Sequence, residues 1–401
     1  MTCRYCKADI VPLLDLGFSP PSNQYIHKAL DVEYYYPLIL NSCVNCRLLQ
    51  TSINIDSKLL FDDDYSYFSS YSSTWLAHCE KLVDEIKDNF KCDNVLEVAS
   101  NDGYLLKILK NKGINAYGIE PTKSTAEVAI QKNLNVVNDF LTIKLAKRLV
   151  KEKGNVDVLI ANNVLAHVPD LKDFIKSIYT LIDSNGVAII EFPYAKNLVE
   201  DNQFDTIYHE HYSYFTLSTV KFIFNENKLE IVDVKNIETH GGSLRIYAKR
   251  MSNNLKVSNQ VTEILTNENK VNLNSLEYFS NMQKTAVKAK INLLNFLLDC
   301  KVKNKKVIAY GAAAKGNTLL NYCGIKKDLL DYVVDKNPYK IGKLLPGSRI
   351  PIKDETEIED SRPDYILILP WNIKNEIIDQ LNYVKEWNAK FVVAIPSLII
   401  K

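Results

Sequence analysis

The stretch Val95-Leu96-Glu97-Val98-Ala99-Ser100-Asn101-Asp102-Gly103 decides the fold. Its first four residues have the pattern of a buried strand, and the remaining five form a turn that leads into the helical spacing of 105–112. A strand, a turn and a helix in this order open a doubly wound α/β sheet, where ligands bind beyond the strand ends. The pattern G-x-G-x-x-G is absent, which argues against a pyrophosphate. The turn instead favours a ligand with a carboxylate, because backbone N–H groups at a helix start bind anions.

Strand and helix patterns alternate along the chain after this stretch. Such alternation implies right-handed βαβ units and a parallel sheet. A helix and two strands that are close enough to pair as a hairpin follow after a long interruption. The predicted strands are 94–98, 116–119, 136–137, 156–161, 187–192, 229–234 and 244–248, and the predicted helices are 105–112, 125–132, 143–151, 171–181 and 219–227.

Polar side chains follow four of these predicted strands. Glu120 ends the second strand, 17 positions after Gly103, where a carboxylate can accept hydrogen bonds from both hydroxyls of a ribose. Each residue alone has the ordinary explanation of a polar loop, but four suitable strand ends in the right order favour a cofactor site. We predict that the cofactor is S-adenosylmethionine (SAM). The predicted cofactor-binding residues are Glu97, Ser100, Asn101, Asp102, Gly103, Glu120, Asn138, Asp139, Phe140, Asn162 and Asn163.

Histidine is scarce in this chain, with only six residues, and two of them lie in Tyr208-His209-Glu210-His211-Tyr212. This block falls in the long interruption after 187–192, which shows no helix or strand pattern of its own. Loops of that length are usually functional or disordered, and this one is rich in aromatic residues. A third histidine, His167, follows the fourth strand. A lone histidine is more often structural than catalytic, but this grouping favours a chemical role.

The residue types in this block suit alkylation of a carbon next to a ketone. That reaction needs a base and a donor for the developing enolate oxygen. We predict that His211 is the base and that Glu210 raises its basicity or holds its tautomer. Tyr208 and His167 can donate to the enolate oxygen. The aromatic segment 65–71 could close over the site.

Four of the eight cysteines form two Cys-x-x-Cys pairs, Cys3 with Cys6 and Cys43 with Cys46. Four thiolates satisfy a tetrahedral Zn²⁺ and leave no open position, so the predicted zinc is structural. The 36 residues between the pairs exceed the usual ribbon spacing, and the second pair is expected to cap a hairpin. Free thiols packed as small hydrophobes and a redox role for one pair are the alternatives.

Length and charge limit the remaining possibilities. The chain has 401 residues, with 49 Lys and Arg against 48 Asp and Glu, a balance without the positive surface that nucleic acid or an anionic membrane attracts. No run approaches the roughly 20 apolar residues of a membrane span, and the first residues do not form a signal peptide. We therefore expect a cytoplasmic protein that binds neither nucleic acid nor membrane. Its oligomeric state stays open.

Three regions differ in residue pattern and predict three domains. These are a zinc-binding module at 1–75, a SAM domain at 76–250 and a smaller α/β domain at 251–401. The polar, Asn-rich stretch 252–274 separates the last two. A long helix is predicted at 276–300, with apolar positions at Met282, Val287, Ile291, Leu294 and Leu298. Strands at 307–310, 332–334, 365–369 and 391–395 and a helix at 318–322 complete the prediction.

The chain resembles the three-domain sugar C-methyltransferases of deoxysugar biosynthesis, which methylate a carbon of a nucleotide-linked keto-sugar. The resemblance implies a zinc module, a central class I SAM domain with a Rossmann-like seven-stranded sheet, and a C-terminal Rossmann-like domain. It also implies that His211 is the base, supported by Glu210, Tyr208, His167 and Tyr65. The resemblance rests on the paired cysteines, Tyr65, 100–103, 163–167, 208–211, Gly241-Gly242-Ser243-Leu244-Arg245 and Tyr310-Gly311-Ala312-Ala313-Ala314-Lys315-Gly316.

In such enzymes the nucleotide diphosphate of the sugar lies between the central and C-terminal domains, so the resemblance implies that the domain at 251–401 binds the nucleotide-sugar. Here Lys315-Gly316-Asn317 follows a strand and opens a helix, which suits an anion, although a structural glycine turn is the alternative. The predicted substrate-binding residues are Arg245, Lys315, Gly316, Asn317, Asp335 and Lys336. Two rival functions are O- or N-methylation of a small metabolite and a zinc-module scaffold without activity.

Overall fold

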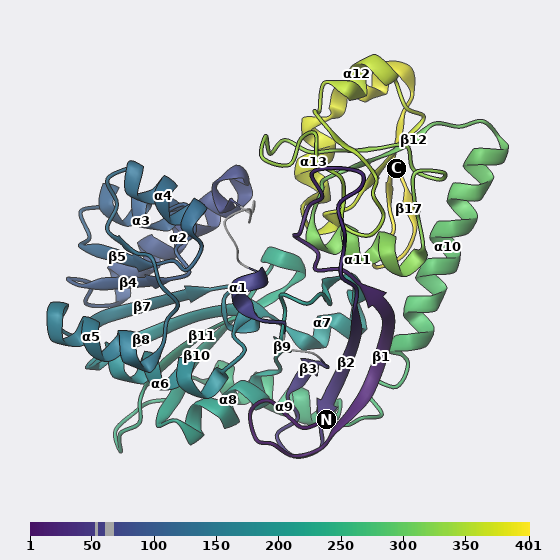
Figure 1. Ribbon diagram of the computed structural model, residues 1–401. Helices are drawn as coiled ribbons and strands as arrows, with labels where there is room; N and C mark the ends of the chain where they lie inside the picture. Colours follow the sequence, from purple (N-terminus) through teal and green to yellow (C-terminus); the bar gives the residue numbers. More distant parts are fainter. Residues whose placement is uncertain (53–54, 61–67) are drawn as a thin grey trace.

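A computed structural model describes residues 1–52, 55–60 and 68–401 of the chain, and its strands form three sheets (Figure 1). Each sheet is accompanied by helices, so the predicted α/β fold class with three units is confirmed. Within these described residues, none of the helices is both long and apolar enough to cross a lipid bilayer.

The first sheet joins the N-terminal segment to one later strand, in the order β1-β2-β3-β9. Its pairs are all antiparallel, and β2 and β3 form the hairpin whose turn carries Cys46, as predicted. Because β9 directly follows the histidine-rich block, this sheet supports the block. The elements are β1 (Ile10–Ser19), β2 (Tyr36–Cys43), β3 (Leu49–Thr51) and β9 (Ser213–Tyr214), followed in the chain after β3 by α1 (Ser57–Leu60) and η1 (Ser69–Tyr71).

The central sheet has seven strands in the order β10-β11-β8-β7-β4-β5-β6. Strands β4 to β8 are parallel, and β11 is antiparallel to both β8 and β10, so the predicted hairpin is confirmed. The strands are β4 (Val95–Val98), β5 (Ala116–Ile119), β6 (Val136–Val137), β7 (Val156–Asn162), β8 (Ile182–Pro193), β10 (Leu229–Ile237) and β11 (Ser243–Arg250).

Helices cover both faces of the central sheet (Figure 1). The side chains of β7 alternate, with Val158 packing in the cluster of α2 and α3 and Leu159 packing in the cluster of α5 and α6. Both faces of a parallel sheet are buried in this way. The helices are α2 (Ser73–Asn89), α3 (Tyr104–Asn111), α4 (Lys123–Gln131), α5 (Ile143–Lys153), η2 (Leu165–His167), α6 (Leu171–Leu181), α7 (Ala195–Glu200), η3 (Phe204–Thr206), α8 (Leu217–Glu226), η4 (Thr239–Gly241) and α9 (Asn259–Lys270).

The third sheet belongs to the C-terminal unit, defined here as α10 to β17, and has the order β14-β13-β12-β15-β16-β17. All its pairs are parallel except that of β16 with β17. The elements are α10 (Met282–Val302), β12 (Val307–Tyr310), α11 (Ala314–Cys323), β13 (Val333–Val334), β14 (Ile352–Lys353), α12 (Glu357–Ser361), β15 (Tyr365–Ile368), η5 (Trp371–Ile373), α13 (Lys374–Gln380), η6 (Asn382–Trp387), β16 (Lys390–Val393) and β17 (Ile399–Ile400).

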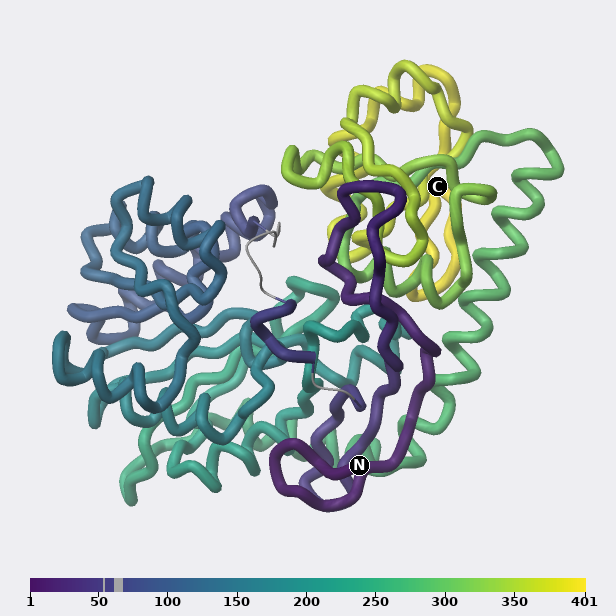
Figure 2. Tube along the Cα trace, in the orientation of Figure 1, coloured from purple at the N-terminus to yellow at the C-terminus, as the bar shows by residue number. Residues whose placement is uncertain are grey.

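The N-terminal loop between β1 and β2 crosses to the C-terminal unit (Figure 2). Ile26 forms a β-bridge with Leu344, and the Tyr25 hydroxyl donates to the carbonyl of Ala312 at 2.6 Å. Glu33 pairs with Arg349 at 2.7 Å. These contacts tie the first and last parts of the chain together.

Three sequence-based expectations need correction. The helix α10 exists and Met282 is buried as expected, but Val287, Ile291 and Leu298 are exposed, because the face that packs runs through Ala286, Ala289, Leu293, Leu297 and Cys300. The interruption after β8 is not structureless, since it contains α7, η3 and β9. The stretch 252–274, expected to separate two domains, forms α9, which packs on α8 and β10.

Glu268 explains why α9 docks there despite its polar sequence. Its buried carboxylate accepts hydrogen bonds from the backbone N–H groups of Leu217 (2.7 Å) and Ser218 (2.9 Å) at the start of α8, and from the Tyr194 hydroxyl (2.9 Å). A carboxylate at a helix N-terminus satisfies donors that the helix itself leaves unpaired.

We expect Glu268→Ala to lower the free energy of unfolding by about 2–3 kcal/mol, because it leaves several buried donors without a partner. Chemical denaturation measures the change. Glu263→Ala, an exposed position on the same helix, is the matched control and should shift the midpoint little. Equal midpoints for the two variants would contradict this role of Glu268.

Candidate active site

A cavity of about 310 Å³ opens at the carboxyl ends of β4, β5 and β7. The chain passes from β4 outward to β6 on one side and returns through β7 on the other, so the cavity lies where the strand order reverses. Doubly wound sheets bind their ligands at this place, and the volume falls in the usual range of about 300–1,000 Å³. Its lining includes five predicted cofactor residues: Asn101, Glu120, Phe140, Asn162 and Asn163.

Four residues that line the cavity have left-handed backbone conformations: Ala99 (φ 57°), Asn101 (φ 50°), Asn163 (φ 54°) and His240 (φ 58°). Asparagine and histidine enter this region more often than other residues, whereas alanine adopts it only at a cost. Residues in such conformations concentrate at ligand sites, where the surrounding structure holds them in place. The clustering supports the view that this cavity is a binding site.

Glu120 is held rigidly at the wall of the cavity. One carboxylate oxygen accepts the backbone N–H of Asn101 at 2.8 Å, and the other accepts that of Thr122 at 2.9 Å. Burial raises the pKa of this carboxyl. The carboxylate is thus prepositioned at the cavity wall, where its oxygens face the position of a ligand hydroxyl in the fit to SAM.

The amide of Asn162 offers unpaired polar atoms to a ligand in the cavity. Its side chain is buried and lines the cavity, and among the described residues neither of its amide atoms has a hydrogen-bond partner. Asn163 Oδ1 is likewise buried without a hydrogen-bond partner among the described residues. A buried amide without partners costs free energy unless a ligand satisfies it. The donors and acceptors at the end of β7 therefore fit the amino-acid part of SAM, and those at Glu120 fit its ribose.

The other predicted cofactor residues surround the cavity without lining it. Asp102 accepts hydrogen bonds from Ser70 and Lys132, and Asn138 donates to the carbonyl of Glu120 at 2.8 Å. Burial raises the pKa of Glu97 well above its ordinary value. A direct cofactor contact stays a prediction for Glu97, Ser100, Asp102, Gly103, Asn138 and Asp139.

The histidine-rich block forms a turn in which the N–H of His211 donates to the carbonyl of Tyr208 at 3.0 Å. The ends of such a turn lie close together, and the Tyr208 hydroxyl contacts His211 Nε2 at 2.8 Å. His211 Nδ1 lies 3.0 Å from the carbonyl of Thr206. Because a carbonyl only accepts, Nδ1 carries the proton and Nε2 carries the lone pair.

His167 lies beside His211 and lines the cavity, so it connects the block to the predicted cofactor site. The two ring centroids are 4.6 Å apart. Burial lowers the pKa of His167 to about 4. Burial, and after it the electrostatic effect of His167, lowers the pKa of His211 well below 6.5. Both rings are therefore neutral at physiological pH, as a base and a donor must be.

The expected contact between Glu210 and His211 is wrong. The carboxylate of Glu210 points away within the turn and accepts the backbone and side-chain N–H groups of Asn23 at 2.9 and 3.1 Å. The carbonyl of Thr206 holds the tautomer of His211 instead. Tyr65, also predicted for the catalytic set, lies outside the described residues.

The contacts of Arg245 also differ from those expected from the sequence. Its guanidinium is buried and bonds Glu191 at 2.6 Å, Glu85 at 3.0 Å and His78 at 3.1 Å. This network lies within the central unit and braces α2 against β8 and β11. These contacts give Arg245 a structural role in the central unit that the sequence did not predict, and its contact with a substrate stays a prediction.

Among the lining residues that the sequence reasoning missed are two aromatic side chains, Trp75 and His240. Their rings meet edge to face with centroids 4.9 Å apart, and Trp75 also stacks on His78 at 5.1 Å. Asn163 Nδ2 lies 3.5 Å from His240 Nδ1. His240 directly precedes Gly241-Gly242, a motif that marks a special backbone conformation, and this was the signal that could have identified it.

The predicted residues of the C-terminal unit lie at the start of α11 and the end of β13. Asn317 is buried and donates to the carbonyl of Ser22 at 2.6 Å, and Asp335 accepts the N–H of Ala312 at 2.7 Å. Lys315 Nζ donates to Asn372 at 2.8 Å and lies 4.5 Å from the centroid of the Trp371 ring. Lys336 is exposed.

The four paired cysteines converge, and their Sγ atoms all lie within 4.8 Å of one another. Cys3 and Cys46 are 3.6 Å apart, and Cys6 and Cys43 are 3.3 Å apart. Cys3 and Cys43 are fully buried. Four sulfur ligands at these separations, with no fifth ligand group among the described residues, fit a closed structural zinc site.

Family models match three consecutive parts of the chain. These are a zinc binding domain at residues 3–61, a methyltransferase domain at 72–234 and a C-methyltransferase C-terminal domain at 238–396. The matches follow the same order as the three sheets.

Among curated relatives, the C-methyltransferase NovU of Streptomyces niveus is 29% identical over 401 residues, covering 98% of this chain and 95% of the relative. The ubiquinone biosynthesis O-methyltransferase of Rickettsia prowazekii (strain Madrid E) is 28% identical over 117 residues, covering 28% of this chain and 45% of that protein. A crystal structure of magnesium protoporphyrin IX methyltransferase from Synechocystis PCC 6803 with bound SAH matches 44% of this chain and 83% of that protein, with 18% identity and a TM-score of 0.36.

Proposed function

We propose that this chain, a SAM-dependent C-methyltransferase whose three domains fit the sugar C-methyltransferase family, methylates a carbon next to the ketone of a nucleotide-linked 4-keto sugar. The observation that carries the proposal is the contact of His211 with Tyr208 and His167 beside the cavity. Methylation of oxygen or nitrogen needs one base at most, whereas carbon alkylation needs a base and a donor together.

In this proposal His211 Nε2 removes the proton from the carbon. The proton moves to the imidazole, and the electron pair forms an enolate whose oxygen is stabilised by the donors around it. Bound SAM supplies an electrophilic methyl group. The enolate carbon bonds to that methyl as the sulfur–methyl bond breaks, the sulfur leaves with the electron pair as a neutral thioether, and the carbonyl re-forms. Because Nδ1 already donates to Thr206, Nε2 carries the lone pair, which accepts the Tyr208 hydroxyl until that hydroxyl turns to the substrate.

We assign the cofactor to the cavity at β4, β5 and β7. Glu120 receives the ribose hydroxyls, Asn162 and Asn163 receive the amino-acid end, and Phe140 borders the adenine. The nucleotide diphosphate is assigned to the junction with the C-terminal unit, near Gly316, Asn317 and Lys336. Asp335 holds the turn at Ala312 in this assignment.

Glu120→Gln should weaken SAM binding by about 10- to 100-fold, because hydrogen bonds to a charged acceptor contribute about 1.5–3 kcal/mol. Isothermal calorimetry measures the dissociation constant. Glu127→Gln, an exposed carboxylate on α4, is the control and should leave it unchanged. An unaltered affinity for SAM in Glu120→Gln would contradict the ribose assignment.

Exchange with solvent deuterium tests the carbon chemistry directly. Nucleotide-linked 4-keto sugars are incubated in D₂O with the wild-type protein and without SAM, and mass spectrometry follows the carbon next to the ketone. The proposal expects deuterium at that carbon and a gain of one methyl when SAM is added. Methyl transfer without exchange would favour the rival, O- or N-methylation of a small metabolite.

A further inference from the structure

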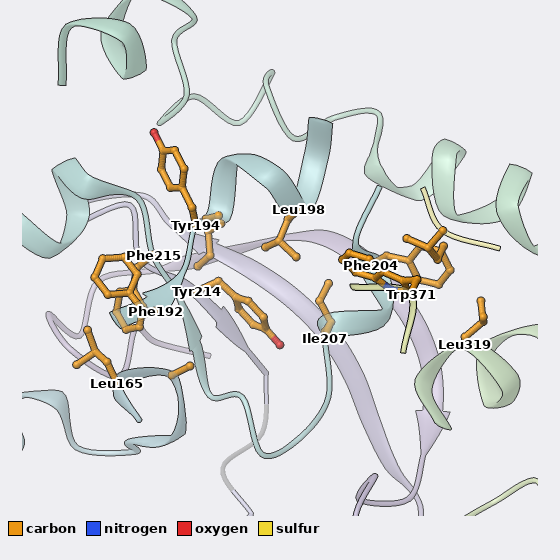
Figure 3. Packing of buried hydrophobic residues seen from close by; sticks show 14 of the residues in the cluster. Leu165, Phe192, Tyr194, Leu198, Phe204, Ile207, Tyr214, Phe215, Leu319 and Trp371 are labelled. Atoms are coloured by element: carbon orange, nitrogen blue, oxygen red, sulfur yellow. The ribbon is translucent and has the colours of Figure 1, made fainter. Parts of the chain in front are cut away.

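The junction between the histidine-rich block and the C-terminal unit is built around Trp371. Its indole Nε1 donates to Asp205 Oδ2 at 2.8 Å, and Asp205 precedes Thr206, whose carbonyl holds His211. A Cβ added to Gly241 would lie 2.5 Å from the indole, so the backbone next to His240 packs directly on this ring. In Figure 3 the Trp371 side chain lies beside Phe204 of η3. Trp371 therefore contacts residues that lie next to the supports of His211 and His240.

Lys315 rests on this same indole. Its ammonium lies 4.5 Å from the ring centroid and donates to Asn372 at 2.8 Å. Thr318, one turn further along α11, donates to the carbonyl of Ile207 at 3.0 Å and fixes the helix against the block. Lys315 is partly exposed.

The charge of Lys315 acts on the groups around it. It lowers the pKa values of His211 and His240, after the larger effect of burial on both. The buried carboxyl of Asp205 is the charged partner from η3, and burial raises its pKa. Burial also lowers the pKa of Lys315 itself, which Asp205 partly opposes. The Lys315 cation thus acts on the neutral imidazoles of His211 and His240 and on the buried carboxyl of Asp205.

This placement differs from that of an anchor for a diphosphate. The Lys315 ammonium lies on Trp371, which is hydrogen-bonded to Asp205 of η3, whereas the diphosphate is assigned near Gly316, Asn317 and Lys336. Of the three donors of the ammonium, one goes to Asn372, and no other hydrogen bond of Lys315 forms among the residues that the structure describes. Two donors therefore remain on an ammonium that lies on Trp371, the residue whose indole donates to Asp205 beside Thr206.

We propose that Lys315 is a catalytic residue whose ammonium binds the ketone oxygen of the substrate and stabilises the enolate that forms when His211 removes the neighbouring proton. This proposal rests on the function proposed above. The C–H pair moves into the new carbon–carbon double bond, the carbonyl pair moves to oxygen, and the proton is held by His211. A fixed cation at a developing oxyanion is among the strongest contributions to catalysis.

The test measures deuterium exchange without SAM in wild type, Lys315→Met and Lys315→Arg. Lys315→Met should slow exchange by on the order of 100-fold or more, the usual loss for one oxyanion donor, while the affinity for SAM measured by calorimetry stays unchanged. Lys290→Met is the matched control, because Lys290 also rests on an aromatic ring, that of Tyr322, but at the far end of α11. It should exchange at the wild-type rate.

A pH profile separates a catalytic from a merely structural role. With the charge removed, the pKa of His211 rises, so the acidic limb of exchange should move to higher pH in Lys315→Met. In wild type, exchange should decline at a pH below the ordinary lysine range, because burial lowers the pKa of Lys315. Arginine stays charged, so Lys315→Arg should lose that alkaline decline.

If Lys315→Met is unstable because Asp205 loses the opposite charge near it, Asp205→Asn/Lys315→Met removes both charges and takes its place. Exchange at the wild-type rate with only a raised KM for the keto sugar would overturn the proposal and return Lys315 to a substrate anchor. No exchange in the wild-type protein would instead reject the proposed function, and the catalytic role of Lys315 with it.

Discussion

Replacing His211 with asparagine should reduce methyl transfer by about 10²–10⁴-fold while SAM still binds. The range is the usual contribution of a general base. Asparagine cannot take up a proton, yet its size leaves Tyr208 and Thr206 in place. His211 does not line the cofactor cavity, so calorimetry with SAM should give the wild-type dissociation constant. Steady-state kinetics with SAM and the keto sugar provide the turnover number.

His27→Asn serves as the control, because His27 is exposed and lies outside the block. Near-native turnover in His211→Asn would mean that another group removes the proton. Burial lowers the pKa of His211 well below 6.5. The base is therefore unprotonated at neutral pH, and the acidic limb of kcat/KM should lie below the value of about 6.5 of a free histidine.

Removing zinc should unfold the N-terminal sheet and abolish activity together. Structural zinc contributes about 10–16 kcal/mol of apparent binding free energy to small modules. Cys43→Ser eliminates a fully buried ligand at the end of β2. We expect substoichiometric zinc in the purified variant, a lower Tm and loss of turnover.

Cys92→Ser is the matched control, since Cys92 lies outside the cysteine cluster and is only partly buried. Its zinc content and Tm should equal those of the wild type. A Cys43→Ser protein that lacked zinc but kept its Tm and activity would show that the metal does not support the fold.

Features that depend on short stretches of sequence were predicted well. The spacing of each Cys-x-x-Cys pair alone presents both thiols to one metal, so the cysteine cluster was predictable without the rest of the fold. Likewise the strand–turn–helix at 95–111 carries its pattern locally, and Glu120 and Asn162 follow from the period of βαβ units. In each case the backbone spacing alone determines where the side chain lies.

Features set by contacts between distant segments were not predictable. Arg245 alternates inward on β11 and meets Glu191 and Glu85, which come from two other elements. Glu210 is sequence-adjacent to His211, but the turn sends its carboxylate to Asn23. His240 and Trp75 join the cavity only through packing of η4 on α2. Neither periodicity nor composition specifies such tertiary pairs.

The pairing of β3 with β9 has a consequence for domain exchange among relatives. A chimera that takes residues 1–60 from one protein and the remainder from another would place a foreign β3 beside the native Ser213–Tyr214. That edge carries the backbone of the block containing His211, so a mismatch in the graft is transmitted to the base. Recombinant hybrids should therefore retain activity only when the donor segment and the strand at 213–214 come from the same parent.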